Sequence, residues 1–220
     1  QSMADALKWL GYVSFGYQGY KNNLFGNIQA HEAICAIGRE SLVSAIEVAH
    51  EHNFDVLAAN VDSIFVRKDG AKQPEDFEEV MAAINQKTGL VIELEGIFNW
   101  IAFTRAKTNP RIGAANRYFG RFLDGSVKVR GLAQRRRDTP EWIKDIEKET
   151  ISTLANIEEA ALLADAIPGI IRSLQMHMQA LTDELVPIES LVSKTKLSRE
   201  ISQYRGNSLS AKAAKQLKEA

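Results

Sequence analysis

The sequence predicts an α+β protein in which an antiparallel sheet with packed helices precedes an all-helical part. Apolar residues recur at helical spacing over residues 29–52. Short β-prone runs separated by turn residues occupy residues 55–68 and 117–131. From residue 140 onward the pattern is helical. We therefore place the boundary between the two parts near residue 138.

The first 52 residues predict two helices joined by a loop. Asp5–Ser14 is predicted to be a helix that stops at Gly16, and a Gly/Asn-rich loop follows it. A second helix is expected over about Gln29–His52, because its apolar residues return every third or fourth position. These apolar residues are Ile34, Ile37, Leu42, Ala45, Ile46 and Ala49.

Two β-prone runs, Asp55–Val61 and Ile64–Lys68, are separated only by Asp62-Ser63. This arrangement predicts a β-hairpin with an acidic residue at its tip. An exposed aspartate there can hold a divalent metal ion through hard oxygen ligands. It is also a common turn residue, so the spacing alone leaves both interpretations open.

A helix over Glu75–Gln86 and a strand over Leu90–Thr104 are expected next. Glu93 and Glu95 alternate with apolar residues in this strand, so both point to one face of the sheet. That face is either an ordinary solvated surface or a carboxylate pair beside the hairpin tip.

Two further strands are expected around 117–123 and 126–131, with Asp124-Gly125 as the tight turn between them. Thr139-Pro140 then predicts the N-cap and first residue of the helical part. The expected helix breaks are Pro168-Gly169, Pro187 and Gly206.

The charge is distributed unevenly along the chain. The total is 27 basic against 28 acidic residues, which argues against a uniformly basic nucleic-acid coat. Residues 105–137 nevertheless hold ten basic residues and one acidic residue, a net charge of +9, whereas residues 138–165 hold eight acidic and two basic residues. This asymmetry favours contact with a polyanion by one face, and a face that only improves solubility is the alternative.

Other features limit the class of protein. Cys35 is the single cysteine, so no internal disulfide or Cys-rich zinc module is expected, and we predict a reducing, cytoplasmic location. The most apolar stretch, Ala160–Ile171, is interrupted by Asp165 and Pro168, and no membrane span or signal peptide is expected. Gln1 and Ser2, ahead of Met3, are interpreted as the remnant of an expression tag.

Several segments occur in a recognisable order. They are Lys8–Tyr17, Ala33–Glu40, Asn60–Val66, Ile92–Glu95, Asn116–Tyr118, Arg130–Asp138 and Leu197–Ala214. In this order they resemble the C-terminal part of an archaeal family B DNA polymerase. The matching motifs are the fingers Lys-x-x-x-Asn-Ser-x-Tyr-Gly, the start of the long palm helix, the catalytic Asp-Thr-Asp-Ser hairpin, the Leu-Glu-x-Glu strand, the DNA-contacting Lys-x-Tyr, the start of the thumb and a later thumb segment. The resemblance covers nearly all of residues 5–219.

The resemblance implies a palm-type sheet and the end of the fingers helix over residues 3–137, and a partial helical thumb over residues 138–220. It implies two-metal nucleotidyl transfer with Mg²⁺, primer-template DNA and a deoxynucleoside triphosphate, with Asp62 as metal ligand and Glu95 as a nearby carboxylate. The implied nucleotide-binding residues are Lys8, Tyr12, Phe15 and Gly16, and the implied DNA-binding residues are Arg117, Tyr118, Arg130, Arg136, Arg137 and Arg199.

The family's other metal-binding aspartate lies in an earlier Asp-x-x-Ser-Leu-Tyr-Pro motif, which this sequence lacks. We therefore expect a large polymerase subunit to supply that carboxylate, so that this chain is active only in a complex. Met3 directly behind the tag remnant favours a natural start there, and hence the small subunit of a split polymerase.

The sequence also departs from the family pattern at several positions. Tyr12 and Val13 replace Asn and Ser, and Phe15 replaces Tyr, while Asn60, Asn116 and Ala133 replace Asp, Lys and Glu. These replacements support an alternative hypothesis, a catalytically inactivated, polymerase-like DNA-binding protein. An unrelated α+β protein is the third interpretation.

Overall fold

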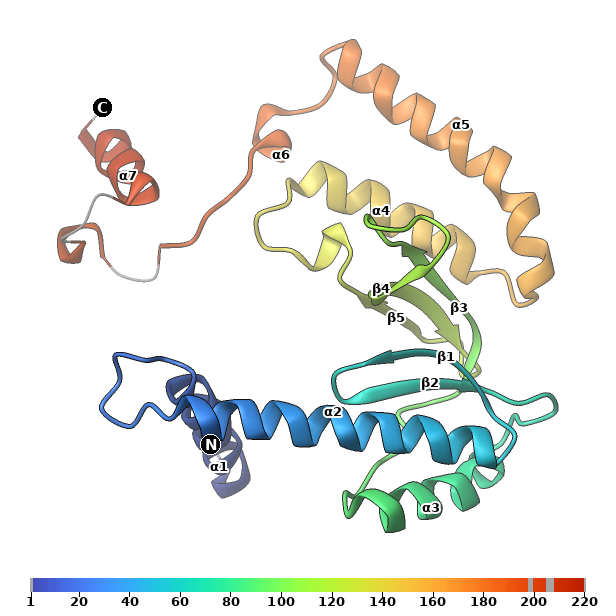
Figure 1. The fold of residues 1–220 in the computed structure, drawn as a ribbon. Helices are drawn as coiled ribbons and strands as arrows, with labels where there is room; N and C mark the ends of the chain where they lie inside the picture. Colours follow the sequence, from blue (N-terminus) through green and yellow to red (C-terminus); the bar gives the residue numbers. More distant parts are fainter. Residues whose placement is uncertain (1, 198–199, 205–207, 220) are drawn as a thin grey trace. The chain divides into compact units, whose positions relative to one another are not determined.

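The computed structural model describes residues 2–197, 200–204 and 208–219. The chain folds as two compact units, Gln1–Ile97 and Phe98–Ala220 (Figure 1). Both units contain helices and antiparallel strands, which confirms the predicted α+β class. The predicted division into a palm part before residue 138 and a thumb part after it stays a prediction.

The first unit consists of two long helices, a hairpin and a third helix. Its elements are α1 (Met3–Gln18), α2 (Ile28–Glu51), β1 (Asp55–Asn60), β2 (Ser63–Arg67) and α3 (Glu78–Thr88), the last preceded by a 3-10 turn at Pro74–Phe77. The predicted hairpin is confirmed, and the predicted first helix is longer than expected because it continues past Gly16 to Gln18.

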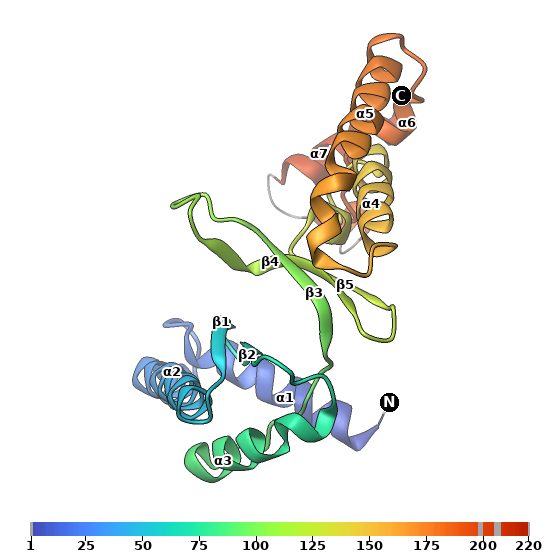
Figure 2. The ribbon, with the colours of Figure 1, turned by 90° about the vertical axis from the view of Figure 1, so that its right-hand side faces the viewer.

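The core of the first unit lies where α2 and α3 pack on one face of the β1–β2 hairpin (Figure 2). Ala49 and Ile84 are almost fully buried there, and Val56 and Ile64 of the hairpin pack against them. Only the C-terminal half of α2 takes part, because residues 32–40 are exposed. Helix α1 contributes no buried residue at all. Much of the surface of α1 and of the first half of α2 is therefore uncovered.

The second unit is a three-stranded antiparallel sheet followed by helices. The strands lie in the order β3 (Phe98–Arg105), β4 (Gly113–Phe122) and β5 (Val127–Arg130). The helices are α4 (Glu141–Ala155), α5 (Leu163–Thr182), α6 (Ile188–Leu191) and α7 (Leu209–Glu219). The predicted tight turn joins β4 to β5, with Gly125 at φ +85°, a conformation that suits glycine.

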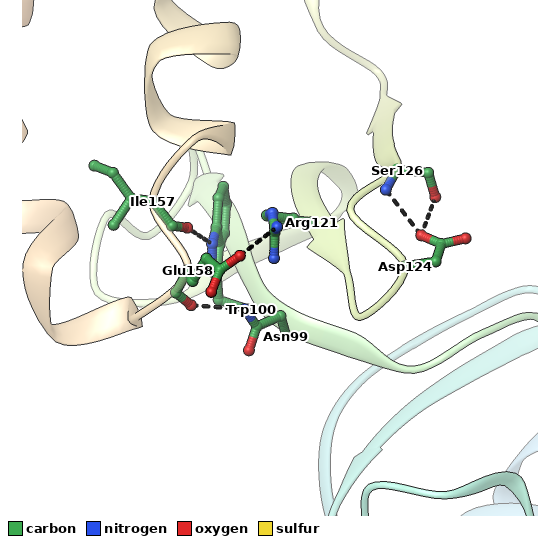
Figure 3. Close-up of polar contacts among 7 residues, drawn as sticks. All are labelled: Asn99, Trp100, Arg121, Asp124, Ser126, Ile157 and Glu158. Atoms are coloured by element: carbon green, nitrogen blue, oxygen red, sulfur yellow. Dashed lines mark hydrogen bonds and ion pairs between the residues drawn. The ribbon is translucent and has the colours of Figure 1, made fainter.

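The loop after α4 is tied to the sheet by three polar contacts (Figure 3). The Trp100 Nε1–H donates to the Ile157 carbonyl at 2.8 Å, and the Asn99 amide donates to the Glu158 carbonyl at 2.6 Å. The Glu158 carboxylate also pairs with Arg121 at 3.1 Å, and the Arg121 side chain is only 15% exposed. These contacts fix the connection between α4 and α5 against β3 and β4.

Three predicted features are wrong in detail. Residues 90–97 form no strand; Ile92 and Leu94 nevertheless pack on the core of the first unit, so the alternation reflects burial without strand pairing. Helix α5 continues through Pro168, which lies early in the helix and removes only one backbone donor. Pro140 occupies the N-cap position itself, so α4 begins one residue later than predicted.

Among the described residues, no helix combines the length and the apolar character that a membrane crossing requires.

Helices α4 and α5 are joined by Glu149, whose carboxylate accepts a hydrogen bond from Ser173 at 2.7 Å and lies 2.9 Å from His177 Nε2. The Ser173 hydrogen bond, followed by the one to His177, lowers the pKa of Glu149 from its usual 4.5. The contribution of Glu149 to stability is therefore present above about pH 4.5 and is lost as the pH falls through the lower folded-state pKa.

We expect Glu149→Gln to lower the thermal midpoint at pH 7 by about 1–3 °C, a small change because the carboxylate is half-exposed. Circular dichroism melts between pH 7 and 3 should show this difference vanish in acid. Glu159→Gln, at an exposed glutamate of the same unit, should leave the thermal midpoint unchanged at both pH 7 and pH 3. A difference that persists unchanged at pH 3 would contradict the assignment.

Candidate functional site

Asp62 lies at the tip of the β1–β2 hairpin, where Asn60 pairs with Ser63. The Asp62 N–H donates to the Asn60 carbonyl at 2.6 Å, and the Ser63 hydroxyl donates to the same oxygen at 3.2 Å. The Asp62 side chain is exposed, and within the described part of the chain its carboxylate forms no hydrogen bond or ion pair. The carboxylate is thus free to bind a cation.

The neighbouring tip residue, Val61, has an unfavourable backbone conformation. Its φ is +48°, in the left-handed region that β-branched residues avoid, and its side chain is 80% exposed. Such a conformation costs about 1–3 kcal/mol and occurs preferentially at functional sites. The strain therefore singles out the hairpin tip as a candidate site independently of the aspartate.

Glu95 lies in the extended segment 91–97 rather than in a strand, and both Glu93 and Glu95 are exposed. The prediction that the two glutamates share a sheet face is therefore wrong, although they do share the face opposite Ile92 and Leu94. Within the described ranges, no three His, Cys, Asp or Glu side chains converge on a possible metal position. Asp62 can thus provide one metal ligand but not a complete site.

Helix α1 presents the predicted nucleotide-binding residues together. Lys8, Tyr12, Phe15 and Gly16 follow one another at spacings of four, three and one residues, so they lie on one face of the helix. The Tyr12 side chain is 63% exposed, and that of Phe15 is 36% exposed. The Phe15 ring, the Tyr12 phenol and the Lys8 ammonium group therefore share a surface that a ligand can reach.

His31 of α2 supports this surface and was missed by the sequence analysis. Its ring stacks on Phe15 with 4.2 Å between the ring centroids, and its Nδ1 lies 3.2 Å from the Phe15 carbonyl oxygen. Gly19 leaves room for the ring, since a Cβ there would lie 2.9 Å from His31 Cε1. The two residues of this stack are sixteen positions apart and are joined by an irregular loop, so no local pattern connects them.

The predicted DNA-binding residues lie on β4, β5 and the segment after β5. Tyr118 and Arg130 are directly opposite each other across the two strands and so share a face of the sheet. Tyr118 is only 5% exposed, and its ring lies 5.6 Å from that of Phe103. The exposed Arg130 and Arg137 are better placed to reach a ligand than Tyr118. Arg199 lies outside the described residues.

Arg136 is held by a neighbour of opposite charge. Its Nε and one terminal nitrogen donate to the two carboxylate oxygens of Asp138 at 3.2 and 2.9 Å. These hydrogen bonds lower the pKa of Asp138 and raise that of Arg136. Both side chains are more than half exposed, so the pair contributes little to stability. Its main effect is to orient the guanidinium.

Glu147 of α4 holds the turn that precedes Arg136 and Arg137. The half-buried Glu147 accepts hydrogen bonds from the backbone N–H groups of Ala133 at 3.1 Å and Gln134 at 2.6 Å. These residues begin the 3-10 turn Ala133–Arg135, which leads directly into Arg136 and Arg137. In the sequence, the acidic stretch stands out only as a contrast to the basic one, and the link from Glu147 to this turn was not predicted.

Gly131 allows two backbone segments to approach each other closely. Its φ is +65°, and a Cβ at this position would overlap the Asn116 carbonyl oxygen. The chain around Gly131 therefore lies directly against Asn116 and Arg117, which brings the end of β5 and the segment leading to Arg136 close to the middle of β4.

Comparison with known proteins gives the family. The model of DNA polymerase family B matches residues 1–219. The chain belongs to DNA polymerase family B.

This family B chain is similar to archaeal polymerases. It is 28% identical over 192 residues to DNA polymerase 2 of Saccharolobus solfataricus, a match that covers 87% of the chain and 28% of that protein. It is 26% identical over 215 residues to a DNA polymerase of Archaeoglobus fulgidus, covering 98% of the chain and 25% of that protein. The chain spans about a quarter of the length of these relatives.

The fold agrees with the family as well. The structure of the family B DNA polymerase from Pyrobaculum calidifontis matches with a TM-score of 0.59 and 20% sequence identity, over 97% of this chain and 25% of that one. At this identity the likeness concerns the fold alone. It bears out the predicted resemblance for the fold.

Proposed function

We propose that this chain is the palm and thumb part of a family B DNA-directed DNA polymerase, with the palm and the end of the fingers helix in residues 3–137 and the partial thumb in residues 138–220. In this proposal it supplies one metal-binding carboxylate, part of the nucleotide site and the grip on duplex DNA. A larger chain completes nucleotidyl transfer. The observation that carries the proposal is the exposed carboxylate of Asp62, unpaired within the described residues, at a strained hairpin tip.

Mg²⁺ is the metal ion that suits this position, because a carboxylate is the hard oxygen ligand that Mg²⁺ prefers. Asp62 would hold the ion, and Glu95 would act as a nearby carboxylate. The bound ions would stabilise the charge that develops on the transferred phosphoryl group. One carboxylate does not make a two-metal site, so the proposal requires the other palm aspartate to come from the partner.

The uncovered surface of the first unit supports a partner of this kind. Leu7 and Leu10 of α1 and Ile37 of α2 are each more than 60% exposed. Apolar side chains gathered on adjacent helices are typical of a surface that another protein covers. We therefore assign the uncovered parts of α1 and α2 to contact with the large polymerase subunit.

In the nucleotide site, Lys8 would lie against the triphosphate, with Tyr12 beside it where the family has an asparagine. Phe15 and Gly16 would form a flat platform next to the new base pair, and the His31 stack would hold the Phe15 ring in place. Arg117, Tyr118, Arg130, Arg136, Arg137 and Arg199 would position duplex DNA without reading its sequence.

The second candidate is an inactivated, polymerase-like DNA-binding protein. It is favoured by Asn60 at the base of the hairpin tip, where the family has a metal-proximal aspartate, and by Tyr12 on the α1 face. Neither replacement affects the basic face of the second unit. DNA binding is therefore common to both candidates, and nucleotide incorporation separates them.

Primer extension by the chain alone and by the chain reconstituted with its large partner tests the proposal, at varied Mg²⁺ and Mn²⁺ concentrations. We expect extension only by the complex. Binding of primer-template without extension under any metal condition would favour the inactivated protein. Full extension by the isolated chain would overturn the split-site proposal.

Lys8→Ala is expected to raise the apparent KM for nucleotide about tenfold or more, while the KM for primer-template changes little. A lysine beside a triphosphate acts as a point charge in a water-poor site, whereas it makes no contact with the duplex. Steady-state kinetics of the complex measure both constants. Lys87→Ala, at the end of α3, is the matched control. An equal rise in both constants would place Lys8 elsewhere.

A further inference from the structure

The second unit contains a cationic recess of about 500 Å³. Four basic side chains line it, from the end of β3, the β3–β4 loop, β4 and the segment after β5: Arg105, Lys107, Arg117 and Arg136. The remaining lining residues are neutral, and they include Asn116 and Thr139, which offer hydrogen-bonding groups. No carboxylate lines the recess among the described residues.

Four like charges around one hollow repel each other unless an anion lies between them. The recess exists because Gly131 lets the chain approach Asn116 and Arg117, which brings Arg136 to the side of β4. The arrangement is thus built by the fold, from positions far apart in the sequence, and is not a chance run of basic residues along one strand.

Asp138 is the acidic residue two positions after Arg136 in the chain. Its two carboxylate oxygens accept hydrogen bonds from the Arg136 guanidinium. An ion pair this exposed is weak, and a phosphate group offers the guanidinium the same two-pronged geometry with more charge. Asp138 is therefore placed to compete with a phosphate for Arg136, one of the four cations.

A second recess, of about 600 Å³, adjoins the first and shares Arg105 with it. Its other lining residues are Arg111 and the largely apolar Phe103, Pro110, Ile112 and Gly113. The cationic surface therefore continues from the first recess through Arg105 to Arg111, as the binding of a strand with successive phosphates requires.

We propose that the recess formed by Arg105, Lys107, Arg117 and Arg136 binds a backbone phosphate of a nucleic-acid strand, and that Asp138 weakens this binding by competing for Arg136. The proposal rests on the DNA-binding part of the proposed function, and it adds Arg105, Lys107 and Asp138 to the duplex contact. It does not depend on catalysis.

The test measures binding of a labelled DNA duplex to the full chain by fluorescence anisotropy, alone and in the reconstituted complex, over a series of salt concentrations. Arg105→Gln/Lys107→Gln should weaken binding about tenfold or more at low salt. It should also reduce the salt slope by roughly 0.9 for each phosphate that the variant no longer neutralises. Lys72→Gln/Lys87→Gln, which removes the same charge from the first unit, should leave the slope unchanged.

Asp138→Asn separates a specific competitor from a general charge effect. We expect it to tighten DNA binding about two- to fivefold, because it releases Arg136. Asp145→Asn, at an exposed acid of α4 paired with Lys148, removes the same charge and should have no such effect. Equal effects of the two variants, or an unchanged salt slope in the double glutamine variant, would overturn the proposal.

Inorganic phosphate distinguishes the two sources of the same chemistry. If the recess serves a nucleic-acid strand, millimolar phosphate should displace DNA no better than chloride at equal ionic strength. Saturable displacement by phosphate that is abolished in the double glutamine variant would instead identify a free-anion site. A complex that fails to extend primers while these binding results hold would refute only the proposed catalytic function.

Discussion

Replacing Asp62 by Ala is expected to abolish nucleotide incorporation by the reconstituted complex, by about 1,000-fold or more, while DNA binding stays unchanged. The aspartate is the only acidic residue at the hairpin tip, and its carboxylate is the ligand that this chain is proposed to give to the metal site. The side chain is exposed and forms no interaction within the described residues that the change would break, so the hairpin should keep its fold.

The measurement is single-turnover primer extension together with anisotropy of the same primer-template. Asp69→Ala, at the opposite end of the hairpin, is the matched control because it also removes an exposed carboxylate. Asp62→Asn should be as inactive as Asp62→Ala, since the amide keeps the size and loses the charge. Normal incorporation by either Asp62 variant would end its assignment as a metal ligand.

The second large effect concerns DNA affinity. Arg136→Ala/Arg137→Ala should weaken duplex binding about 100-fold at low salt and reduce the salt slope by about 2, equally for all sequences. Phosphate contacts fix the register of a duplex without distinguishing bases, which is why the weakening should be uniform. Anisotropy with several unrelated duplexes measures both the slope and the uniformity.

The single variants sharpen this prediction. Arg137 has no partner within the described residues, whereas Arg136 is shared with Asp138. Arg137→Ala should therefore remove only an interaction with DNA, and Arg136→Ala should in addition leave the Asp138 charge uncompensated beside the phosphate. We expect Arg136→Ala to be the more damaging of the two. A weakening confined to one duplex sequence would indicate base recognition instead.

The features that the sequence predicted well are local ones. The β1–β2 hairpin, the Asp124-Gly125 turn and α2 each depend on residues within a few positions of one another, so periodicity and turn composition were sufficient. The alternation in residues 90–97 does correspond to burial, yet it could not indicate whether a neighbouring strand was present.

The candidate site residues also fall into those found from local motifs and those that depend on tertiary contacts. The Asp62 tip and the α1 face followed from short motifs, whereas the His31 support of Phe15 and the Glu147 link to Ala133 and Gln134 depend on contacts between separate elements. Tyr118 matched its motif in sequence, but its burial against Phe103 depends on how β3 pairs with β4. Sequence spacing carries no information about such tertiary contacts.

The absence of buried residues in α1 affects more than the surface it leaves open. A 16-residue helix is only marginally stable in water by itself, and α1 is supported mainly by its capping box at Ser2 and Asp5 and by the Phe15–His31 stack. Its helical state is therefore in equilibrium with frayed states. A ligand or subunit that binds the helical form must supply the ordering free energy and shift this equilibrium, so the proposed nucleotide and partner binding would be thermodynamically coupled through α1.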